Sequence, residues 1–300
     1  MLFLSTLHTA RPKIELSKIC RGSPAPVMAR HKTQNLPDLS ALLTPKNPLM
    51  LAVERAVLRG QDSAYASTPI AEQIAARLAG VITLDLLKSG QRLLEKDISE
   101  VLHVSRAPVR EALRILERDR LVEFQARRGA IVTAPDETEL RDIFRVRSVL
   151  YLTMLEQVAK DSPGELEALM SERLPRLVKA ADESPDAYAV ESFLLNFATV
   201  DLCRNRLLVD ILQSISLRTL RYLRLSMVAS PQSIRISLKR WRALQKAVVG
   251  RDNETLLSLA AQRLDEARDA AVQAIAPMPT RRGARAGKSS KQETSIASPD

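Results

Sequence analysis

The feature that most constrains this 300-residue chain is a run of three short helical patterns followed by two β-prone segments, all within residues 67–135. The third pattern is the clearest. Its apolar residues recur at helical spacing and define one buried stripe, made by Val109, Ala112, Leu113 and Leu116. Period and turn signals together predict helices at 69–87, 95–102 and 105–119, then strands at 121–124 and 130–133.

Three helices and a hairpin with a basic turn are the parts of a winged helix-turn-helix, in which the third helix enters the major groove of DNA. Three arginines lie i, i+4 and i+8 apart, roughly opposite the apolar stripe: Arg106, Arg110 and Arg114. An arginine fork can grip guanine O6 and N7 or a phosphate. Arg127 and Arg128 in the hairpin turn could reach the DNA backbone or the minor groove. The alternative is that Arg110 and Arg114 only form surface pairs with Glu111 and Glu117.

The segment LLEKDISEVLHVSRAPVREALRILERDRLVEFQARRGAIV closely resembles the DNA-binding domain of the GntR family, and SRAPVREAL is nearly verbatim. The resemblance implies a homodimer that reads a short inverted repeat in double-stranded DNA. It also implies the contact positions, which are Lys96, Ser105, Arg106, Arg110 and the wing near Arg128 and Gly129. Two positions depart from the family pattern. Ala107 replaces a common hydroxyl residue and could alter which bases are read, and Arg120 replaces the usual glycine before the wing, where it could add a phosphate contact.

From Pro135 onward the sequence predicts only helices, at 136–160, 164–181, 186–202, 205–229, 232–249 and 253–275. Pro163, Pro185 and Pro231 fall at helix starts, where proline is tolerated. The fold class is therefore mainly α, with a winged helix-turn-helix at 67–135 and an all-helical bundle at 136–276. We expect the proline-rich segment 1–66 and the polar segment 277–300 to be mostly disordered, with a short helix possible at Leu49–Arg59.

Several polar residues interrupt the apolar faces of the helices in 136–276. Arg147 lies on one such face, Ser192 and Asn196 on a second, and Arg263 on a third. Burying an unpaired charge is very costly, so the two arginines need partners. An internal carboxylate such as Glu156 is one solution, and a bound anion is the other.

This helical region resembles, more weakly, the FCD effector domain, which commonly holds a divalent metal through an Asp and three His. The corresponding positions in this chain are Ser192, Asn196, Trp241 and Arg263. None is a good metal ligand, and the three histidines of the chain (His8, His31 and His103) all lie outside the region. We therefore predict no metal and no other cofactor.

The hypothesis is a metal-free pocket for a small organic acid. Arg263 would replace the cation and bind the anionic group. Arg147, which corresponds to an arginine that contacts ligands in the family, could clamp a carboxylate with it. Ser192 and Asn196 would supply hydrogen bonds, and Trp241 would be a core residue or a pocket wall. The alternative is a degenerate domain that binds nothing, which would leave a constitutive DNA-binding regulator.

Charge and missing motifs weigh against other classes of function. The net charge is +10, and the excess lies outside residues 136–276, where acidic and basic residues balance, so nucleic acid is the natural partner. The chain lacks a phosphate-binding glycine loop, a nucleophile elbow and an HExxH motif, so we expect no enzyme and no catalytic residue.

The remaining expectations concern location and mode of action. Two cysteines, Cys20 and Cys203, form no disulfide framework, and no apolar run approaches the ~20 residues of a membrane span. A cytoplasmic homodimer, acting as a repressor that its ligand releases, is the expectation, and activation is the alternative sign of control. A protein that packages DNA without sequence preference is the remaining alternative.

Overall fold

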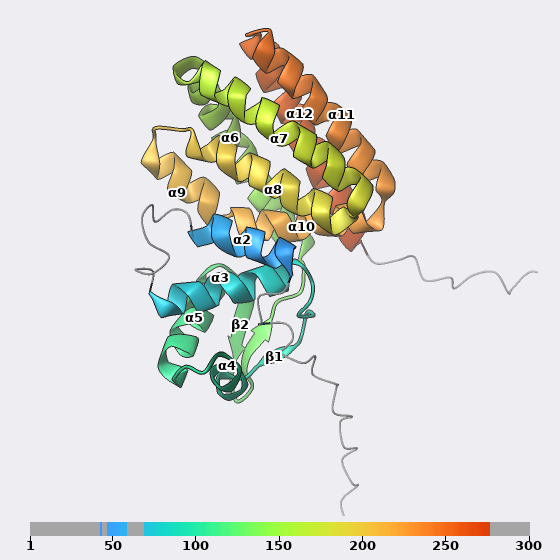
Figure 1. Ribbon diagram of the computed structural model, residues 1–300. Helices are drawn as coiled ribbons and strands as arrows, with labels where there is room; N and C mark the ends of the chain where they lie inside the picture. The colour runs from blue at the N-terminus through green and yellow to red at the C-terminus, as the bar shows by residue number, and fades with distance from the viewer. Residues whose placement is uncertain (1–42, 44–46, 59–68, 277–300) are drawn as a thin grey trace, which may run out of the picture. The chain divides into compact units, whose positions relative to one another are not determined.

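The computed structural model describes residues 43, 47–58 and 69–276, all within one compact unit that runs from Pro37 to Asp300 (Figure 1). Helix α2 (Pro48–Leu58) coincides with the short helix that the sequence allowed at Leu49–Arg59. Leu43, within the segment expected to be mostly disordered, is buried in the core, and residues 1–42, 44–46, 59–66 and 277–300 fall outside the described residues. In the described ranges, no helix is both long and apolar enough to cross a membrane.

The first part of the fold contains the three predicted helices and the hairpin. The helices are α3 (Ile70–Thr83), α4 (Glu95–Leu102) and α5 (Arg106–Arg118), and the hairpin strands are β2 (Val122–Gln125) and β3 (Gly129–Val132). Strand β1 (Arg92–Leu93) adds an antiparallel edge to β3, which gives the sheet order β1-β3-β2. The sequence did not predict β1, because two residues carry no periodic signal.

The first predicted helix is four residues too long at its C-terminus. It was expected to reach residue 87, but α3 ends at Thr83, and Asp85 takes a left-handed backbone with φ of 56°. Apolar residues continue through Leu84, Leu86 and Leu87 because they pack into the core from a turn. Their burial mimics a helical pattern.

The second part is all helical, as predicted. Its elements are α6 (Glu137–Asp161), α7 (Pro163–Glu183), α8 (Pro185–Asp201), α9 (Arg206–Ser214), α10 (Ser216–Ala229), α11 (Pro231–Val249) and α12 (Asn253–Ile275). The single helix predicted at 205–229 is two helices that meet at Ile215. On either side of this break, the hydroxyls of Ser214 and Ser216 donate to backbone carbonyls one turn earlier, a pattern that competes with regular helix geometry.

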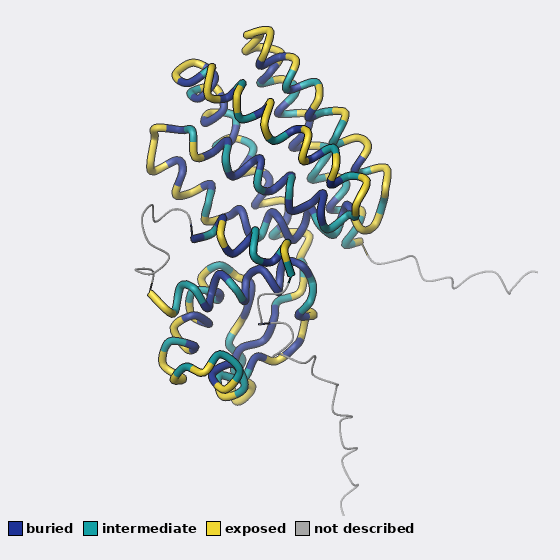
Figure 2. Tube along the Cα trace, viewed as in Figure 1, coloured by how far each residue is buried: buried dark blue, intermediate teal, exposed yellow. Residues whose placement is uncertain are grey.

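Buried side chains of both parts belong to the larger of two hydrophobic clusters among the described residues. The tube in Figure 2, coloured by burial, shows buried residues where the elements face each other. Helix α2 packs against both α3 and α8. Its Met50 and Val53 are fully buried, and its buried Glu54 accepts hydrogen bonds from Arg77 of α3 at 3.1 and 3.4 Å. From α10, the buried Arg221 donates to the Thr133 carbonyl (2.6 Å), the Thr133 hydroxyl (3.1 Å) and the Ser89 hydroxyl (3.0 Å).

Candidate nucleic-acid interface and ligand pocket

The apolar stripe of α5 is buried, and the opposite side of the helix is exposed. Val109, Ala112, Leu113 and Leu116 are buried among the elements packed on this helix. Arg106, Arg110 and Arg114 are exposed on α5. The helix therefore presents a row of guanidinium groups to solvent, in the arrangement that the sequence predicted.

Arg110 forms a two-pronged ion pair with Glu95 at the start of α4. Its Nε and Nη2 donate to the two carboxylate oxygens at 2.9 Å each. These hydrogen bonds hold the pKa of the Glu95 carboxyl below its ordinary value. The surface pair suggested between Arg110 and Glu111 is therefore wrong, because α4 brings a better-placed acceptor to the guanidinium fork.

Arg114 does form the surface pair that the alternative predicted, with Glu117 at 2.7 Å. Its guanidinium carbon also lies 4.2 Å from the centroid of the Phe124 ring on β2. These contacts place the middle of α5 beside the hairpin.

The remaining predicted contact residues lie at the surface of α4, the start of α5 and the hairpin turn. Lys96 is exposed, 3.8 Å from Glu100. Ser105 is exposed at the N-cap of α5, and its side chain makes no capping hydrogen bond. Arg127 and Arg128 are exposed in the turn, which left-handed φ values of 64° at Arg127 and 78° at Gly129 make tight.

The two departures from the family pattern have different surroundings. Ala107 is exposed in the first turn of α5. Arg120 has a φ of 55°, in the left-handed region that glycine adopts without strain. A side chain at this turn is therefore strained, which explains why glycine is the usual residue there.

The helical part brings Arg263, Asn196 and Trp241 into contact. Arg263 of α12 is only 5% exposed; its Nη2 donates to the Asn196 Oδ1 of α8 at 2.8 Å. Its guanidinium carbon lies 4.2 Å from the centroid of the Trp241 ring. The Asn196 amide in turn donates to the carbonyl of Ser192. Asn196 of α8 and Trp241 of α11 thus contact the buried cation of α12, although the three residues lie far apart in the sequence.

Arg147 of α6 is a second buried cation near the first. It is 4% exposed, and its only hydrogen bond among the described residues is a long one of 3.5 Å to the Ser216 hydroxyl. The ring of Tyr151 lies near both arginines: its centroid is 5.5 Å from the Arg147 guanidinium carbon and 5.7 Å from that of Arg263. Burial, together with the charge of Arg263, lowers the pKa of Arg147 to about 10.

Within the described part of the chain, neither buried arginine forms an ion pair with a carboxylate. Glu156, the predicted internal partner, is exposed and contacts neither, so that solution is wrong. The Nε of Arg263 and the Nε1 of Trp241 are buried without a hydrogen-bond partner. No carboxylate among the described residues therefore balances either charge, and two buried donors lack an acceptor.

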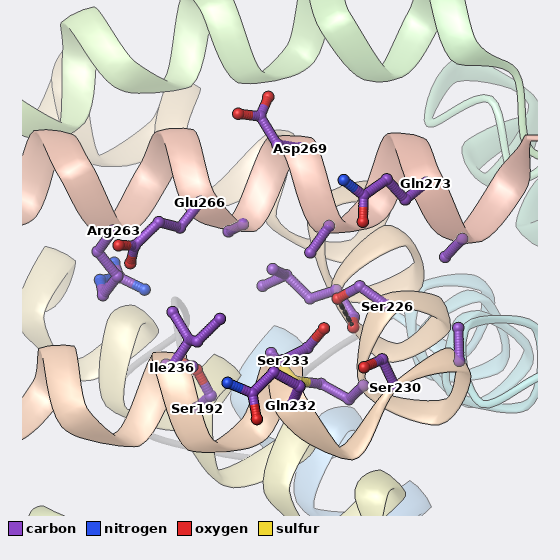
Figure 3. Close-up of a pocket in the computed structure, with 17 residues that line it drawn as sticks. Ser192, Ser226, Ser230, Gln232, Ser233, Ile236, Arg263, Glu266, Asp269 and Gln273 are labelled. Carbon is purple, nitrogen blue, oxygen red and sulfur yellow. Dashed lines mark hydrogen bonds between the residues drawn. The ribbon is translucent and has the colours of Figure 1, made fainter.

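A cavity of about 470 Å³ opens beside Arg263, between α12 on one side and α10 and α11 on the other (Figure 3). Of the predicted effector residues, only Ser192 and Arg263 line it. Asn196 and Trp241 contact Arg263 but do not line the cavity, and Arg147 does not reach it. In the described residues, no group of three His, Cys, Asp or Glu side chains is placed to hold a metal ion.

Sequence reasoning missed most of the cavity wall. Polar side chains there come from the end of α10 and the start of α11, namely Ser226, Ser230, Gln232, Ser233 and Ser237, and from α12, namely Glu266, Asp269 and Gln273. The sequence analysis used only Pro231 in this region, as a helix start. The serines on either side of that proline were the one available signal.

Two family models match the chain: bacterial regulatory proteins, gntR family, over residues 70–132, and the FCD domain over residues 142–266. Together they cover more than half of it. The HTH-type transcriptional regulator YdhC of Bacillus subtilis is 26% identical over 151 residues, which are 50% of this chain and 67% of that protein. The gluconate operon transcriptional repressors of Bacillus licheniformis and Bacillus subtilis are each 31% identical over 38% and 41% of this chain. The match spans about half of their lengths, 46% and 51%.

Two solved structures share the fold. E. coli McbR/YncC has a TM-score of 0.61 at 22% identity, and a GntR regulator from Rhodococcus sp. RHA1 has 0.60 at 23% identity. Each likeness covers 69% of this chain and 98% or 99% of the solved one. With a helix-turn-helix DNA-binding domain before an FCD domain, the chain belongs to the GntR family of bacterial transcriptional regulators.

Proposed function

We propose that this regulator binds a short inverted repeat as a homodimer and that a small organic acid, bound without a metal, controls its affinity for DNA. DNA binding is assigned to residues 67–135 and ligand binding to residues 136–276. The observation that carries the ligand assignment is the buried Arg263, which lines the cavity and has no carboxylate partner among the described residues. The proposal includes no catalytic step and no cofactor, and it places the protein in the cytoplasm with its DNA.

Base reading is assigned to the exposed arginines near the start of α5. Arg106 and Arg110 would contact base edges, because the N-terminal end of a recognition helix is the end that enters the groove. Arg110 donates two parallel hydrogen bonds to Glu95, and the O6 and N7 atoms of guanine would accept two hydrogen bonds from an arginine in the same way. Ser105, Lys96, Arg114, Arg127 and Arg128 would contact the backbone, and Gly129 would let the wing turn approach it closely.

The DNA assignment is tested by selecting a site from a random duplex pool and then titrating the protein on that site and on a scrambled duplex. Arg110→Ala should weaken the specific complex by about 1–3 kcal/mol and leave the scrambled complex nearly unchanged. Arg128→Ala is the matched control, since loss of a phosphate contact weakens both complexes alike. Equal losses on both duplexes for Arg110→Ala would contradict base reading.

The dimer is supported by apolar side chains exposed on two helices that pack against each other. Val146 and Val149 lie on α6, and Leu207 and Ile211 on α9; Val149 is 65% exposed and Leu207 70%. A second copy would remove these side chains from water. Sedimentation of the wild type should give a dimer, and a charge introduced by Val149→Asp should shift it toward monomer. A wild-type monomer on operator DNA would contradict the homodimer.

The ligand assignment is tested by thermal shift against a panel of organic and sugar acids, each with zinc and with a chelator. Stabilisation by an acid, unchanged by the chelator and lost in Arg263→Met, is the expected result. If only the metal stabilises the protein, the roles given to Ser192, Asn196, Trp241 and Arg263 are wrong. If nothing stabilises it, the alternative of a constitutive regulator with a degenerate domain is favoured.

Repression that the ligand relieves is the proposed sign of control. The ligand can shift the equilibrium only if it binds the DNA-competent and released conformations with different affinities. Helix α8 carries Ser192 and Asn196 and packs against α2, which packs against α3 of the DNA-binding part. Because α3 also packs against α5, a continuous series of packed helices connects the pocket with the recognition helix.

A further inference from the structure

We infer that the ligand is an elongated monocarboxylic acid, with its carboxylate at Arg263 and a mainly apolar body that lies along α12 toward Ala274. The inference rests on the proposed binding of an anion at Arg263 and adds the shape and the chemistry of the remainder of the ligand.

The cavity is long because one stripe of α12 lines it from end to end. Arg263, Ala267, Ala270 and Ala274 recur at helical spacing, and all four line the cavity. At 1.5 Å per residue, the stripe extends about 16 Å along the helix axis. Figure 3 shows Arg263 at one end of the lined space and Gln273 toward the other. A compact acid at Arg263 would leave most of this length empty.

The body of the cavity is hollow because its floor is made of alanines. Ala267, Ala270 and Ala274 extend no further than Cβ, so α12 offers a shallow trough to the facing helices. Across from them, Leu223 and Met227 of α10 and Ile236 of α11 supply apolar surface. Ile236 is 40% exposed, and a ligand body would remove it from water.

The charges of the cavity favour one anionic group at one end. Glu266 lines the cavity, but its carboxylate is held by Arg240, and Asp269 is held by Arg268 at 2.9 Å. Arg263 is the lining side chain whose charge has no carboxylate partner in the described part of the chain. A second anionic group farther along the trough would therefore find no unpaired cation.

Two of the lining serines already have partners, so the body of the ligand has few hydrogen bonds to gain from them. Ser226 donates to the Leu223 carbonyl at 2.7 Å, and Ser237 accepts from the Tyr188 hydroxyl at 2.9 Å. Apolar contacts in the trough come from the three alanines of α12 and from Leu223, Met227 and Ile236. This favours an alkyl or aryl body over a polyhydroxylated one.

The experiment is calorimetric titration of the full-length chain with butanoate, octanoate, octanamide and tartrate. Octanoate should bind about two orders of magnitude more tightly than butanoate, because each buried methylene contributes roughly fourfold. Octanamide, which lacks the charge, and tartrate, which is compact and hydroxylated, should bind weakly. Arg263→Met should abolish octanoate binding.

Ala270→Leu separates the shape of the ligand from its charge, since it fills the trough at mid-length and leaves Arg263 in place. It should weaken octanoate at least tenfold and leave butanoate unchanged. The matched control is Ser258→Leu, which adds the same side chain at an exposed position of α12 outside the cavity and should change neither.

The outcomes distinguish the two proposals. Equal affinities for tartrate and octanoate, or octanoate binding that Ala270→Leu leaves intact, would overturn the elongated ligand while anion binding at Arg263 stands. Octanoate binding that survives Arg263→Met, or no binding of any acid, would overturn both.

Discussion

Replacing Arg263 by methionine should leave the unliganded protein at least as stable as the wild type, which is an unusual expectation for a buried arginine. Methionine fills a similar volume without the charge. The informative comparison is Arg221→Met, since Arg221 is equally buried, at 6% exposed against 5% for Arg263. The two sites differ in how well the fold satisfies the guanidinium.

The magnitudes follow from the partners. Arg263 loses one charge-assisted hydrogen bond to Asn196, about 1.5–3 kcal/mol, and a stacked contact with Trp241, up to about 2 kcal/mol. Removing an unpaired buried charge also removes its desolvation cost of several kcal/mol. After the two losses are subtracted from this gain, Arg263→Met should stabilise the protein by between about 0 and 2 kcal/mol.

Arg221→Met instead removes three hydrogen bonds, one to the exposed Ser89 and two to the half-buried Thr133. Even after the same desolvation gain is included, Arg221→Met should lower the free energy of unfolding by about 3 kcal/mol.

Urea unfolding of the three proteins without ligand measures these differences directly, and thermal melting provides a check. Arg221→Met should lower the melting temperature by about 6–12 °C, at roughly 2–4 °C per kcal/mol. Arg263→Met should match or exceed the wild type. A loss at Arg263 as large as that at Arg221 would refute the reasoning, because it would mean that the fold already satisfies the Arg263 cation and needs no anion.

Three further predictions concern local features of the fold. Arg120→Gly should stabilise the protein by about 0.5–1 kcal/mol in urea unfolding, because glycine takes the left-handed φ of 55° without strain; a loss of stability would show that the side chain makes a compensating contact. Met50→Ala should cost about 2–5 kcal/mol by the same assay, since Met50 is fully buried where α2 meets Gly80; an unchanged midpoint would mean that α2 is not docked in solution. Hydrogen bonds from the side chain and then the backbone of Thr255 hold the pKa of the Asp252 carboxyl below its ordinary value of 3.8. The stabilisation by this cap is therefore complete above that value and is lost as the pH falls through the lowered pKa. Asp252→Asn should reduce the fall of the urea midpoint between neutral and acid pH. An identical fall in both proteins would contradict the assignment.

Much of the fold could be read from the sequence because helices are specified locally. The stripe Val109, Ala112, Leu113 and Leu116 fixed both the presence of α5 and the side that it buries, and prolines fixed where α7, α8 and α11 begin. The errors occur where local signals are weak or shared. A two-residue strand leaves no period, and the serines around Ile215 leave apolar spacing intact while they break the backbone ladder.

The sequence alone determined which residues could carry function: a row of arginines on one helix, and polar side chains on faces that must be buried. Only the tertiary structure decided what those side chains meet. It gave Arg110 a partner in Glu95, left Arg147 and Arg263 without a carboxylate in the described residues, and opened a trough between α12 and two helices that precede it. The physical reason is that spacing along one helix fixes the direction of a side chain, whereas its partners come from elements far apart in the chain and depend on how those elements pack.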